Sequence, residues 1–427
     1  MTPCHLRRVS VDLTPVLPGG ENGGAKVLAC TLVRSMSILA PSTQFTLLTS
    51  ALSHHELAEL DSENTHRQCV DVDLASQLPT GRTVSGARLA ARVLIDSLVP
   101  PGARMHVKDA VWRLVKARRR GRVARELLAD LHFAPFTAPF FYDRRVPVVS
   151  VVHDVQFLDH PEWFDEATRI SRTQHFNDAC ERADRLICVS EFVRQSVLAH
   201  TRLPAERVQT IHSTVLHAST RTDDDAAIAH RLLEQLGMTG RRVLLYPANP
   251  WPHKNHHRLI EAWAMYVTSR PDSDLVLVCT GAPLDGFQQL EAIARDILPA
   301  GRFAVAGFLD EREFAALLHT CRAVVFPSLY EGFGLPVLEA MSSERPVLCS
   351  NATSLPEIVG EGALLFDPSE PHSITCAIER LEAEPQLERA LIKRGRERVA
   401  TFGTVFDVAA KYLDAFEDVA ATRRRLT

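Results

Sequence analysis

Short, nearly continuous apolar runs alternate with helix-length segments along most of the chain. Such runs predict parallel β-strands buried on both faces, because the helices that connect parallel strands cover both sides of the sheet. We therefore expect an α/β fold built from doubly wound, Rossmann-like domains. The expected strands span residues 7–13, 44–50, 146–154, 185–190, 208–213, 242–249, 274–281, 303–309, 323–329, 346–351 and 363–368. The expected helices span residues 25–39, 165–183, 224–236, 256–268, 286–297, 311–321 and 335–343.

A polar stretch, HASTRTDDDAA (217–227), interrupts the alternation and has the composition of a linker. Because 427 residues are too many for one ordinary core, we expect one domain on each side of it. The first domain is expected to span 1–216 and the second 217–403, with a helix at about 404–424 packing back on the first. Residues 80–130 do not follow the alternation and indicate an inserted, mostly helical and basic region.

The composition argues against several classes of protein. A formal charge of −4 does not favour a dedicated nucleic-acid binder, and no apolar run is long enough to span a membrane. The nine cysteines are scattered, without a CxxC pair, which favours a reducing cytosol over a disulfide framework. The first residues, MTPCHLRRVSVDL, lack the apolar region of a signal peptide. We therefore expect a cytoplasmic protein.

The stretch FPSLYEGFGLPVLEAM (326–341) joins an expected strand to an expected helix. Ligands of open α/β sheets bind beyond the carboxyl ends of strands, so this loop is a candidate binding site. Gly332 and Gly334 allow a sharp turn and a close approach of the backbone to a ligand, and Pro336 suits a first helical turn. The N–H groups that open the helix would then face an anion or a sugar hydroxyl.

Two glutamates flank this turn, Glu331 in the loop and Glu339 in what we expect to be the first helical turn. Their carboxylates could accept hydrogen bonds from the hydroxyl groups of a ribose or a hexose. Either residue alone could equally be a solvated acid. The glycines, the proline and the spacing together favour a binding site.

The Glu331-x7-Glu339 spacing around EGFGLPVLEAM resembles the signature of retaining glycosyltransferases of the GT-B fold, family 4 (glycosyltransferase group 1). Only residues 80–130 and the extreme termini lie outside the resemblance. It implies two Rossmann-like domains that face each other across a cleft, and transfer of a sugar from a nucleotide diphosphate held mainly by the second domain. The other matching stretches are GGENGGAKVLA (19–29), VVHD (151–154), ADRLICVSEF (183–192), YPANPWPHKNHHRLIEAW (246–263) and NATSLPEIVGEGALLFDP (351–368).

The resemblance implies roles for residues of the second domain. Glu339 would take the ribose hydroxyls and Glu331 a hydroxyl of the transferred sugar. Lys254 corresponds to the family's phosphate-binding lysine, and a fixed cation there stabilises the charge that the leaving diphosphate gains. The amides implied to contact the sugar or the phosphates are those of Phe333, Gly334 and Leu335.

In the first domain, the resemblance implies that Gly23 and Gly24 offer backbone N–H groups to the donor. It also places His153, with Glu331 and Lys254, among the catalytic residues. His153 would touch the sugar or the acceptor hydroxyl, and Asp154 would orient it. Because the leaving phosphate helps to deprotonate the acceptor in retaining members, His153 would position the substrate and would not act as a base.

The chain departs from the family at Ala248, where many members carry an arginine about six residues before the lysine. Either Asn249 and Lys254 suffice for the phosphates, or another cation such as Arg258 or Lys26 takes part. The stretch PANPWPHKNH resembles that of a mannosyltransferase-like branch of the family, which favours GDP-mannose as the donor.

A metal requirement is not expected. Asp71 and Asp73 form the Asp-x-Asp pair by which another glycosyltransferase fold binds Mn²⁺ or Mg²⁺, but alternation along a short strand also puts both carboxylates on one face. His253, His256 and His257 crowd one loop but supply too few ligands for zinc. We therefore expect no cofactor other than the substrate nucleotide sugar.

The basic segment 111–125 admits two interpretations. It is either a solvated helical face or a surface that docks on anionic lipid, which would place the protein peripherally at the inner face of the plasma membrane. Its basic residues, interleaved with Trp112, Leu114 and Val115, are Arg113, Lys116, Arg118, Arg119, Arg120, Arg122 and Arg125.

The features together predict a retaining, metal-independent glycosyltransferase. We expect transfer of mannose from GDP-mannose to a glycan or lipid-linked oligosaccharide in cell-surface polysaccharide synthesis. Two alternatives stay open: a catalytically silent scaffold subunit with the same fold, and a nucleotide-sugar epimerase. Hydrolysis of the donor would distinguish an active enzyme from a silent scaffold subunit. Conversion of the donor without an acceptor would identify an epimerase.

Overall fold

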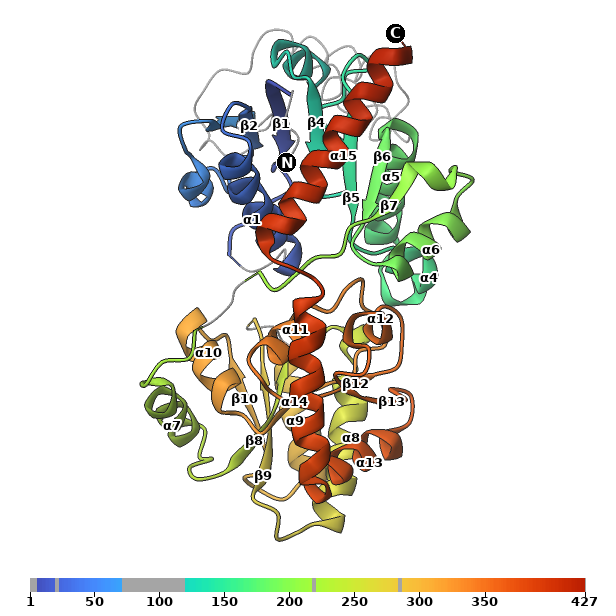
Figure 1. Ribbon diagram of the computed structural model, residues 1–427. Coiled ribbons are helices and arrows are strands. Elements are labelled where there is room, and N and C mark those ends of the chain that lie inside the picture. The colour runs from blue at the N-terminus through green and yellow to red at the C-terminus, as the bar shows by residue number, and fades with distance from the viewer. Residues whose placement is uncertain (1–5, 20–22, 71–119, 217–219, 283–285, 427) are drawn as a thin grey trace, which may run out of the picture. The chain divides into compact units, whose positions relative to one another are not determined.

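The computed structural model describes residues 6–19, 23–70, 120–216, 220–282 and 286–426 (Figure 1). Two compact units divide the chain. The first comprises Met1–Val151, Gln174–Leu186 and Ala409–Thr427, and the second comprises Val152–Thr173 and Ile187–Val408. Residues 152–173 and 187–216 thus belong by their contacts to the second unit, although the sequence places them in the first expected domain.

The first sheet has seven strands in the order β3-β2-β1-β4-β5-β6-β7, and the boundary between the units passes through it near β6. The pairings among β1 to β5 are parallel, as the apolar runs predict. The strands are β1 (Arg8–Asp12), β2 (Gln44–Thr49), β3 (Thr65–Cys69), β4 (Leu131–Ala134), β5 (Val148–Val152), β6 (Arg185–Cys188) and β7 (Val208–Thr210).

Helices connect these strands. The elements are α1 (Gly23–Leu39), η1 (Glu56–Leu60), α4 (Gln156–Asp159), η3 (Pro161–Trp163), α5 (Glu166–Arg182), α6 (Glu191–His200) and η4 (Ala205–Arg207). A further short helix covers residues 120–126, within the expected insertion, of which residues 80–119 lie outside the described part of the chain.

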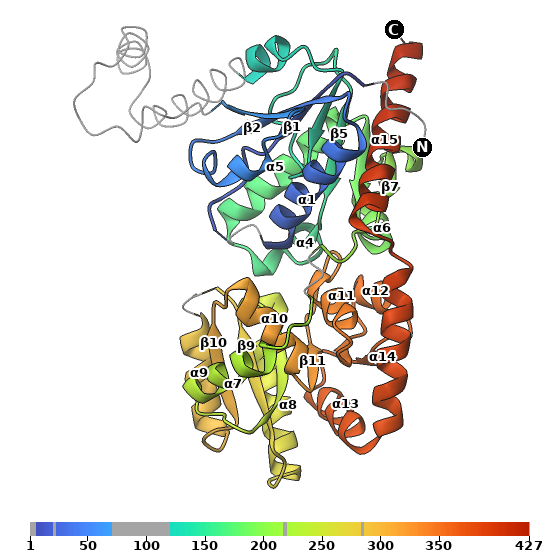
Figure 2. The same cartoon turned by 60° about the vertical axis from the view of Figure 1, so that its left-hand side comes forward.

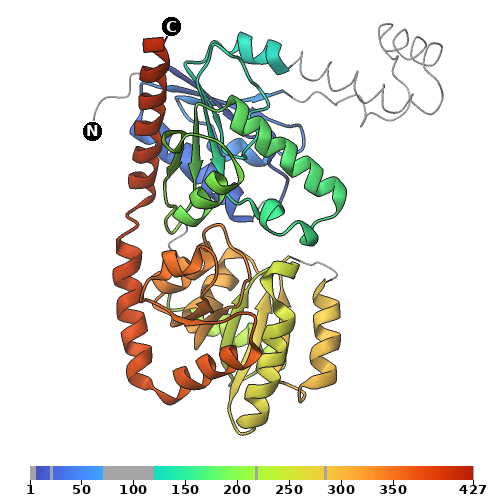
Figure 3. The same cartoon turned by 90° about the vertical axis from the view of Figure 1, so that its right-hand side faces the viewer.

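The last helix, α15 (Val405–Leu426), supplies part of the core of the first unit (Figure 3). The ring of Phe133 on β4 lies 5.8 Å from the ring of Tyr412 and 5.0 Å from that of Phe416, measured between centroids. The Glu417 carboxylate accepts the Leu6 N–H at 3.0 Å just before β1. Residues more than 270 positions apart therefore complete one hydrophobic core.

The second sheet has six strands in the order β10-β9-β8-β11-β12-β13, all paired in parallel. This is the Rossmann order, in which the chain reverses direction between β8 and β11 and leaves a crevice at the carboxyl ends of these two strands. The strands are β8 (Arg242–Pro247), β9 (Leu275–Thr280), β10 (Phe303–Gly307), β11 (Ala323–Phe326), β12 (Val347–Ser350) and β13 (Leu364–Phe366).

The helices between residues 225 and 400 cover this sheet, and α7 packs against α10 (Figure 2). They are α7 (Asp225–Gln235), η5 (Pro252–Lys254), α8 (His256–Ser269), α9 (Gly286–Ile297), α10 (Glu311–Thr320), α11 (Leu335–Ser342), α12 (Leu355–Val359), α13 (Pro371–Ala383) and α14 (Pro385–Ala400). The core around β8, β9 and β11 is closed by fully buried Trp263 and Tyr246. None of the described helices combines the length and the apolarity needed to cross a membrane.

Candidate functional site

The loop between β11 and α11 ends in a turn that only glycine tolerates. Gly334 is the N-cap of α11 and has φ +101°, a conformation that side chains with a Cβ rarely adopt. A Cβ at this position would also lie 2.6 Å from Leu355 Cδ2. Pro336 occupies the first turn of the helix, where its missing N–H leaves no acceptor unsatisfied.

Gly332 packs directly against the chain that follows β5. A Cβ on Gly332 would meet the His153 carbonyl oxygen at 1.9 Å and Asp154 Cβ at 3.4 Å. The Ser190 hydroxyl donates to the Gly332 carbonyl at 2.6 Å. The loop is therefore held against residues that follow β5 and β6, and His153 and Asp154 lie beside it.

The loop is anchored through its carbonyl groups and the Glu331 N–H, which donates to the Thr353 hydroxyl at 3.0 Å, and three of its amides are left available. The Ser354 hydroxyl contacts the carbonyl oxygens of Glu331 and Phe333 at 2.9 and 3.1 Å. The backbone N–H groups of Phe333, Gly334 and Leu335 have no hydrogen-bond acceptor among the described residues. Three consecutive N–H groups at a helix N-terminus form a site for an anion or a hydroxyl oxygen.

Lys254 and Glu331 form an ion pair across the crevice at the carboxyl ends of β8 and β11. Lys254 Nζ lies 2.6 Å from Glu331 Oε1, and the two side chains are only 17% and 12% exposed. The backbone around Lys254 is fixed by the Tyr246 hydroxyl, which donates to the Lys254 carbonyl at 2.5 Å, and by the Leu329 N–H, which donates to the His253 carbonyl at 2.7 Å. The cation and the carboxylate that the sequence predicts for the site therefore lie in direct contact.

Asn255 ties the lysine loop to the neighbouring loops. It is buried, has φ +62°, and its amide donates to the carbonyl oxygens of Pro327 at 3.0 Å and Pro368 at 2.7 Å. It stands at the N-cap position of α8, but its side chain makes these bonds and does not cap the helix. Asn255 therefore sets the position of Lys254, a role that the sequence did not indicate.

Glu339 lies in the second turn of α11, and the expected place in the first turn is wrong because the helix begins at Leu335. Burial raises the pKa of Glu339 to about 7. No described residue hydrogen-bonds to its carboxyl group. A carboxyl group that is desolvated and lacks partners is suited to a ligand that brings its own donors, such as the hydroxyl pair of a ribose.

The residues considered for the second phosphate contact have other partners. Asn249 Oδ1 accepts the Ala282 N–H at 2.7 Å, and Ala248 is buried. Arg258 donates to Asn255 Oδ1 at 3.2 Å. In the first unit, Lys26 is paired with Glu56 at 2.5 Å.

Arg172 is a cation near the loop that the sequence analysis missed. Its Nη1 lies 4.0 Å from Asp154 Oδ1, and its guanidinium stacks 4.9 Å from the Phe164 ring centroid. Burial, then the charge of Lys254 and, as a smaller effect, the charge of Arg172 lower the pKa of His253 to about 4. Arg172 therefore lies within electrostatic reach of the lysine loop. Its position in a polar helix gave no sequence signal.

Other expected residues lie elsewhere or outside the described chain. Gly23 and Gly24 are exposed at the start of α1 in the first unit, and Gly23 has φ +51°. Asp71, Asp73 and residues 111–119 lie outside the described part of the chain. Within that part, no three His, Cys, Asp or Glu side chains are grouped so that they could hold a metal ion.

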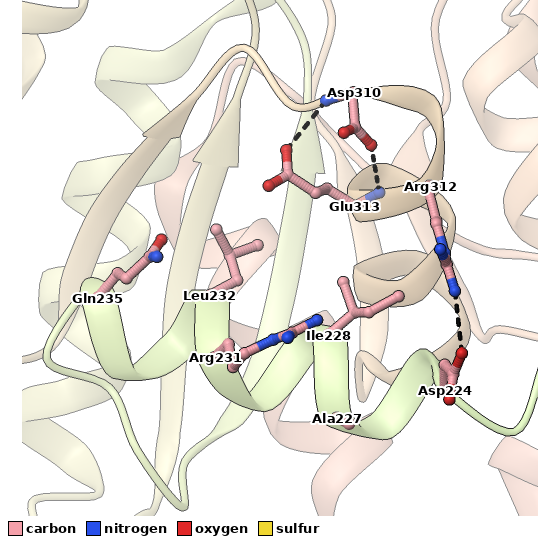
Figure 4. Close-up of a pocket in the computed structure, with 9 residues that line it drawn as sticks. All are labelled: Asp224, Ala227, Ile228, Arg231, Leu232, Gln235, Asp310, Arg312 and Glu313. Atoms are coloured by element: carbon pink, nitrogen blue, oxygen red, sulfur yellow. Dashed lines mark hydrogen bonds and ion pairs between the residues drawn. The ribbon is translucent and has the colours of Figure 1, made fainter.

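A separate pocket lies between α7 and α10 (Figure 4). The Arg312 guanidinium crosses the pocket and donates to the Asp224 carboxylate at 2.9 Å. Asp310 and Glu313 form a capping box at the start of α10. Its charged groups are largely used in these structural contacts, so it does not compete with the crevice as the functional site.

A parallel sheet of Rossmann order thus carries a lysine, two glutamates and available amides at its switch point, a set of groups suited to a ligand that combines phosphates and hydroxyl groups. Residues 62–218 match the model of Glycosyltransferase Family 4, and residues 232–398 match that of Glycosyl transferases group 1. The chain belongs to this family of glycosyltransferases, as its motifs predict.

Curated relatives include mannosyltransferases. The chain is 28% identical over 271 residues to O-antigen chain mannosyltransferase B of Escherichia coli, covering 62% of this chain and 69% of that protein. It is 30% identical over 223 residues to the serotype-specific mannosyltransferase WbdA of Escherichia coli, covering 52% of this chain but only 27% of the relative.

Among solved structures, Anabaena HepE in complex with UDP and glucose matches with a TM-score of 0.68 at 18% identity, covering 96% of this chain and 99% of that one. The likeness confirms the predicted fold class, GT-B.

Proposed function

We propose that the chain is a retaining mannosyltransferase that uses GDP-mannose. Two relatives are named as mannosyltransferases, one of them for the O-antigen chain, and the PANPWPHKNH loop resembles the same branch. The proposed acceptor is a glycan or a lipid-linked oligosaccharide of a cell-surface polysaccharide, and the proposed location is the cytoplasm. The docking of 111–125 on anionic lipid stays a prediction.

The observation that carries the proposal is the 2.6 Å pair between Lys254 and Glu331 beside the available amides of residues 333–335. A diphosphate needs a cation and N–H donors, and a sugar needs a carboxylate acceptor. This arrangement presents all three within one crevice. Its low exposure strengthens every electrostatic interaction, because little water competes.

The residues divide the work of the proposed reaction. Lys254 and the amides of residues 333–335 stabilise the diphosphate as the bond from the anomeric carbon to the phosphate oxygen breaks. Glu331 fixes a hydroxyl of the sugar, and Glu339 fixes the ribose. The acceptor oxygen then bonds to the anomeric carbon on the face that the phosphate leaves, and its proton passes to the leaving phosphate.

Three residues beside the loop complete the proposed site. His153 positions the sugar or the acceptor hydroxyl, and Asp154 holds the turn after β5 by accepting the Gln156 N–H at 3.1 Å. Arg172 supplies the second cation that Ala248 cannot supply. It reaches the site from α5, a different element from the one that carries the family's arginine.

The test is a donor screen followed by product analysis. Thermal shift with GDP-, UDP- and dTDP-sugars should give the largest stabilisation with GDP-mannose. Incubation with labelled GDP-mannose and a glycan acceptor should give an α-linked product, which NMR identifies by the one-bond coupling between C1 and H1 of the mannose. A β-linked product, a preference for another donor, an epimerised donor, or binding without any turnover would each contradict the proposal.

A further inference from the structure

A second concave site lies in the first unit, between the helix of residues 120–126, the loop of residues 140–145 and the second half of α5. Its cavity has a volume of about 830 Å³. The helix is held in place because Val123, Ala124 and Leu127 pack against Phe140 and Phe141. We call this site the basic pocket, and the arginines that line it are Arg120, Arg125, Arg144, Arg145 and Arg182.

The basic pocket carries a local excess of positive charge. Five guanidinium groups face two carboxylates, Asp143 and Asp178. The charge of Arg120 also acts on the Asp12 carboxyl group, so two positive charges are left over. Asp143 binds Arg145 through two hydrogen-bonded contacts, at 3.2 and 2.7 Å, and Asp178 pairs with Arg182 at 2.9 Å. The chain as a whole has a formal charge of −4, so this excess is not a general property of the surface.

Two of the remaining arginines are available for a ligand. The side chains of Arg125 and Arg144 are exposed, and neither has a hydrogen-bond or ion-pair partner among the described residues. Arg125 is nevertheless close enough to Asp143 for its charge to lower the pKa of that carboxyl group, after the larger effect of the Arg145 hydrogen bond. The two available arginines line the same pocket.

Aromatic rings form another part of the lining. The Arg120 guanidinium lies 4.6 Å from the Phe140 ring centroid, and that of Arg182 lies 5.6 Å from the Tyr142 ring centroid. His175 packs edge-on against Phe140 at 5.1 Å, and burial lowers its pKa, so its ring is neutral at pH 7. Stacking restricts the arginines, which reduces the entropy lost when they bind a ligand.

We propose that the basic pocket binds the phosphate or diphosphate group of a ligand other than the sugar donor. Guanidinium groups bind phosphate oxygens in pairs, and two uncompensated positive charges match a diphosphate better than a carboxylate, which would neutralise only one. The aromatic rings can contact the organic part of such a ligand. The diphosphate can be free in solution or carried by a lipid.

The probe is inorganic pyrophosphate, titrated calorimetrically into the full-length chain. The Lys254→Ala variant serves as the background, because pyrophosphate also fits the donor site. Arg125→Gln with Arg144→Gln should weaken binding at least about 10-fold, since two charged hydrogen-bond donors are lost. Arg122→Gln is the matched control: this arginine is on the same helix, but it is 76% exposed, pairs with Glu126 and does not line the pocket.

A third variant gives a change of the opposite sign, which misfolding cannot mimic. Asp143→Asn removes a negative charge and releases Arg145, so pyrophosphate binding should become tighter. Asparagine can still accept the Arg145 N–H, which Asp143 Oδ1 accepts at 3.0 Å, so the loop keeps its shape.

Vesicle sedimentation separates the two sources of the phosphate. Binding to phosphatidylcholine vesicles that contain phosphatidic acid, with none to phosphatidylcholine alone, supports a lipid-borne phosphate if pyrophosphate competes and the double variant fails to bind. Pyrophosphate binding without sedimentation supports a soluble ligand. The proposal is overturned if pyrophosphate does not bind, or if the double variant binds it as tightly as Arg122→Gln does.

Discussion

The Cβ atom that any side chain would add to Gly332 lies 1.9 Å from the carbonyl oxygen of His153. No rotamer change relieves this overlap, because the backbone fixes the position of the Cβ atom and its partner is a backbone oxygen. We predict that Gly332→Ala displaces the loop and lowers turnover about 100-fold, the effect of a misplacement of about 1 Å in an active site. Steady-state kinetics and circular dichroism are the measurements.

The matched glycine for this experiment is Gly121, whose added Cβ would meet only the flexible end of Arg125 at 3.7 Å. Gly121→Ala should leave turnover unchanged and slightly favour its helix. Equal activity in Gly332→Ala and the parent would show that the contact with His153 does not fix the loop.

The two glutamates should affect different kinetic constants. Glu339→Ala should weaken donor binding, because its carboxyl group is assigned to the ribose. Glu331→Ala should mainly lower kcat, because its contact is with the transferred sugar. Each loss should be about 1.5–3 kcal/mol, the value of a hydrogen bond to a charged group. Donor binding by calorimetry and kcat by product formation are needed together, and two variants that behave like the parent would exclude both residues from the site.

The buried carboxyl group of Glu339 should also make stability depend on pH. Its pKa is about 7 in the folded chain against an ordinary value of 4.5, so the folded state binds a proton that the unfolded state releases between these values. The associated stability is complete below pH 4.5 and is lost as the pH rises through 7. Glu339→Gln should therefore raise the stability at pH 8, on the order of 3 kcal/mol at about 1.4 kcal/mol per pKa unit, and leave it unchanged near pH 4.

Thermal or urea unfolding across this pH range measures the effect. The control is Glu397→Gln, an exposed acid of α14 that is 3.9 Å from Lys393. It should show no such trend. A Glu339→Gln effect that is the same at pH 4 and pH 8 would contradict a raised pKa.

The two cations of the proposed site should act on the same step. Lys254→Met removes the charge beside the diphosphate and should lower kcat by 10²–10³-fold, the effect of losing one preorganised group that stabilises developing charge. Arg172→Met should lower kcat less, because this side chain is more exposed. Lys393→Met serves as a control on a distant surface helix. An Arg172→Met variant with the parent's kcat and donor affinity would leave the second phosphate contact unassigned.

Activity should survive treatment with EDTA. The proposed mechanism stabilises the leaving diphosphate with Lys254 and backbone amides, so chelation removes nothing that it requires. The rate of transfer is compared before and after chelation and after addition of Mn²⁺ or Mg²⁺. Complete loss on chelation with recovery on addition of metal would bring Asp71 and Asp73 back as candidates.

Local patterns in the sequence predicted most strands of the two sheets and the order of most helices, but they did not predict two strands. The edge strand β3, THRQC, is largely exposed and has no apolar pattern, and β4, LHFA, is only four residues long and runs directly into a segment with two prolines, Pro135 and Pro139. Both are recognised only by their pairing with β2 and β1.

The site shows the same division between local and distant information. Glu331, Gly332, Gly334 and Glu339 belong to one short motif, and its glycines have the conformations that the turn requires. Asn255 and Arg172 act through contacts with residues far away in the chain, and a lone asparagine or an arginine in a polar helix carries no such signal. The helical turn that holds Glu339 depends on where α11 begins. The helix begins directly after Gly334, and sequence patterns locate such a start only to within a few residues.

The ion pair between Lys254 and Glu331 has a consequence for the end of the catalytic cycle. Before the donor arrives the two side chains satisfy each other, and in the proposed complex the diphosphate occupies Lys254 while the sugar occupies Glu331. Once the sugar has left with the acceptor, Glu331 has lost its partner and competes with the spent nucleotide for Lys254. Re-formation of the pair then drives nucleotide release, so the spent nucleotide inhibits less than its share of the donor's contacts would suggest.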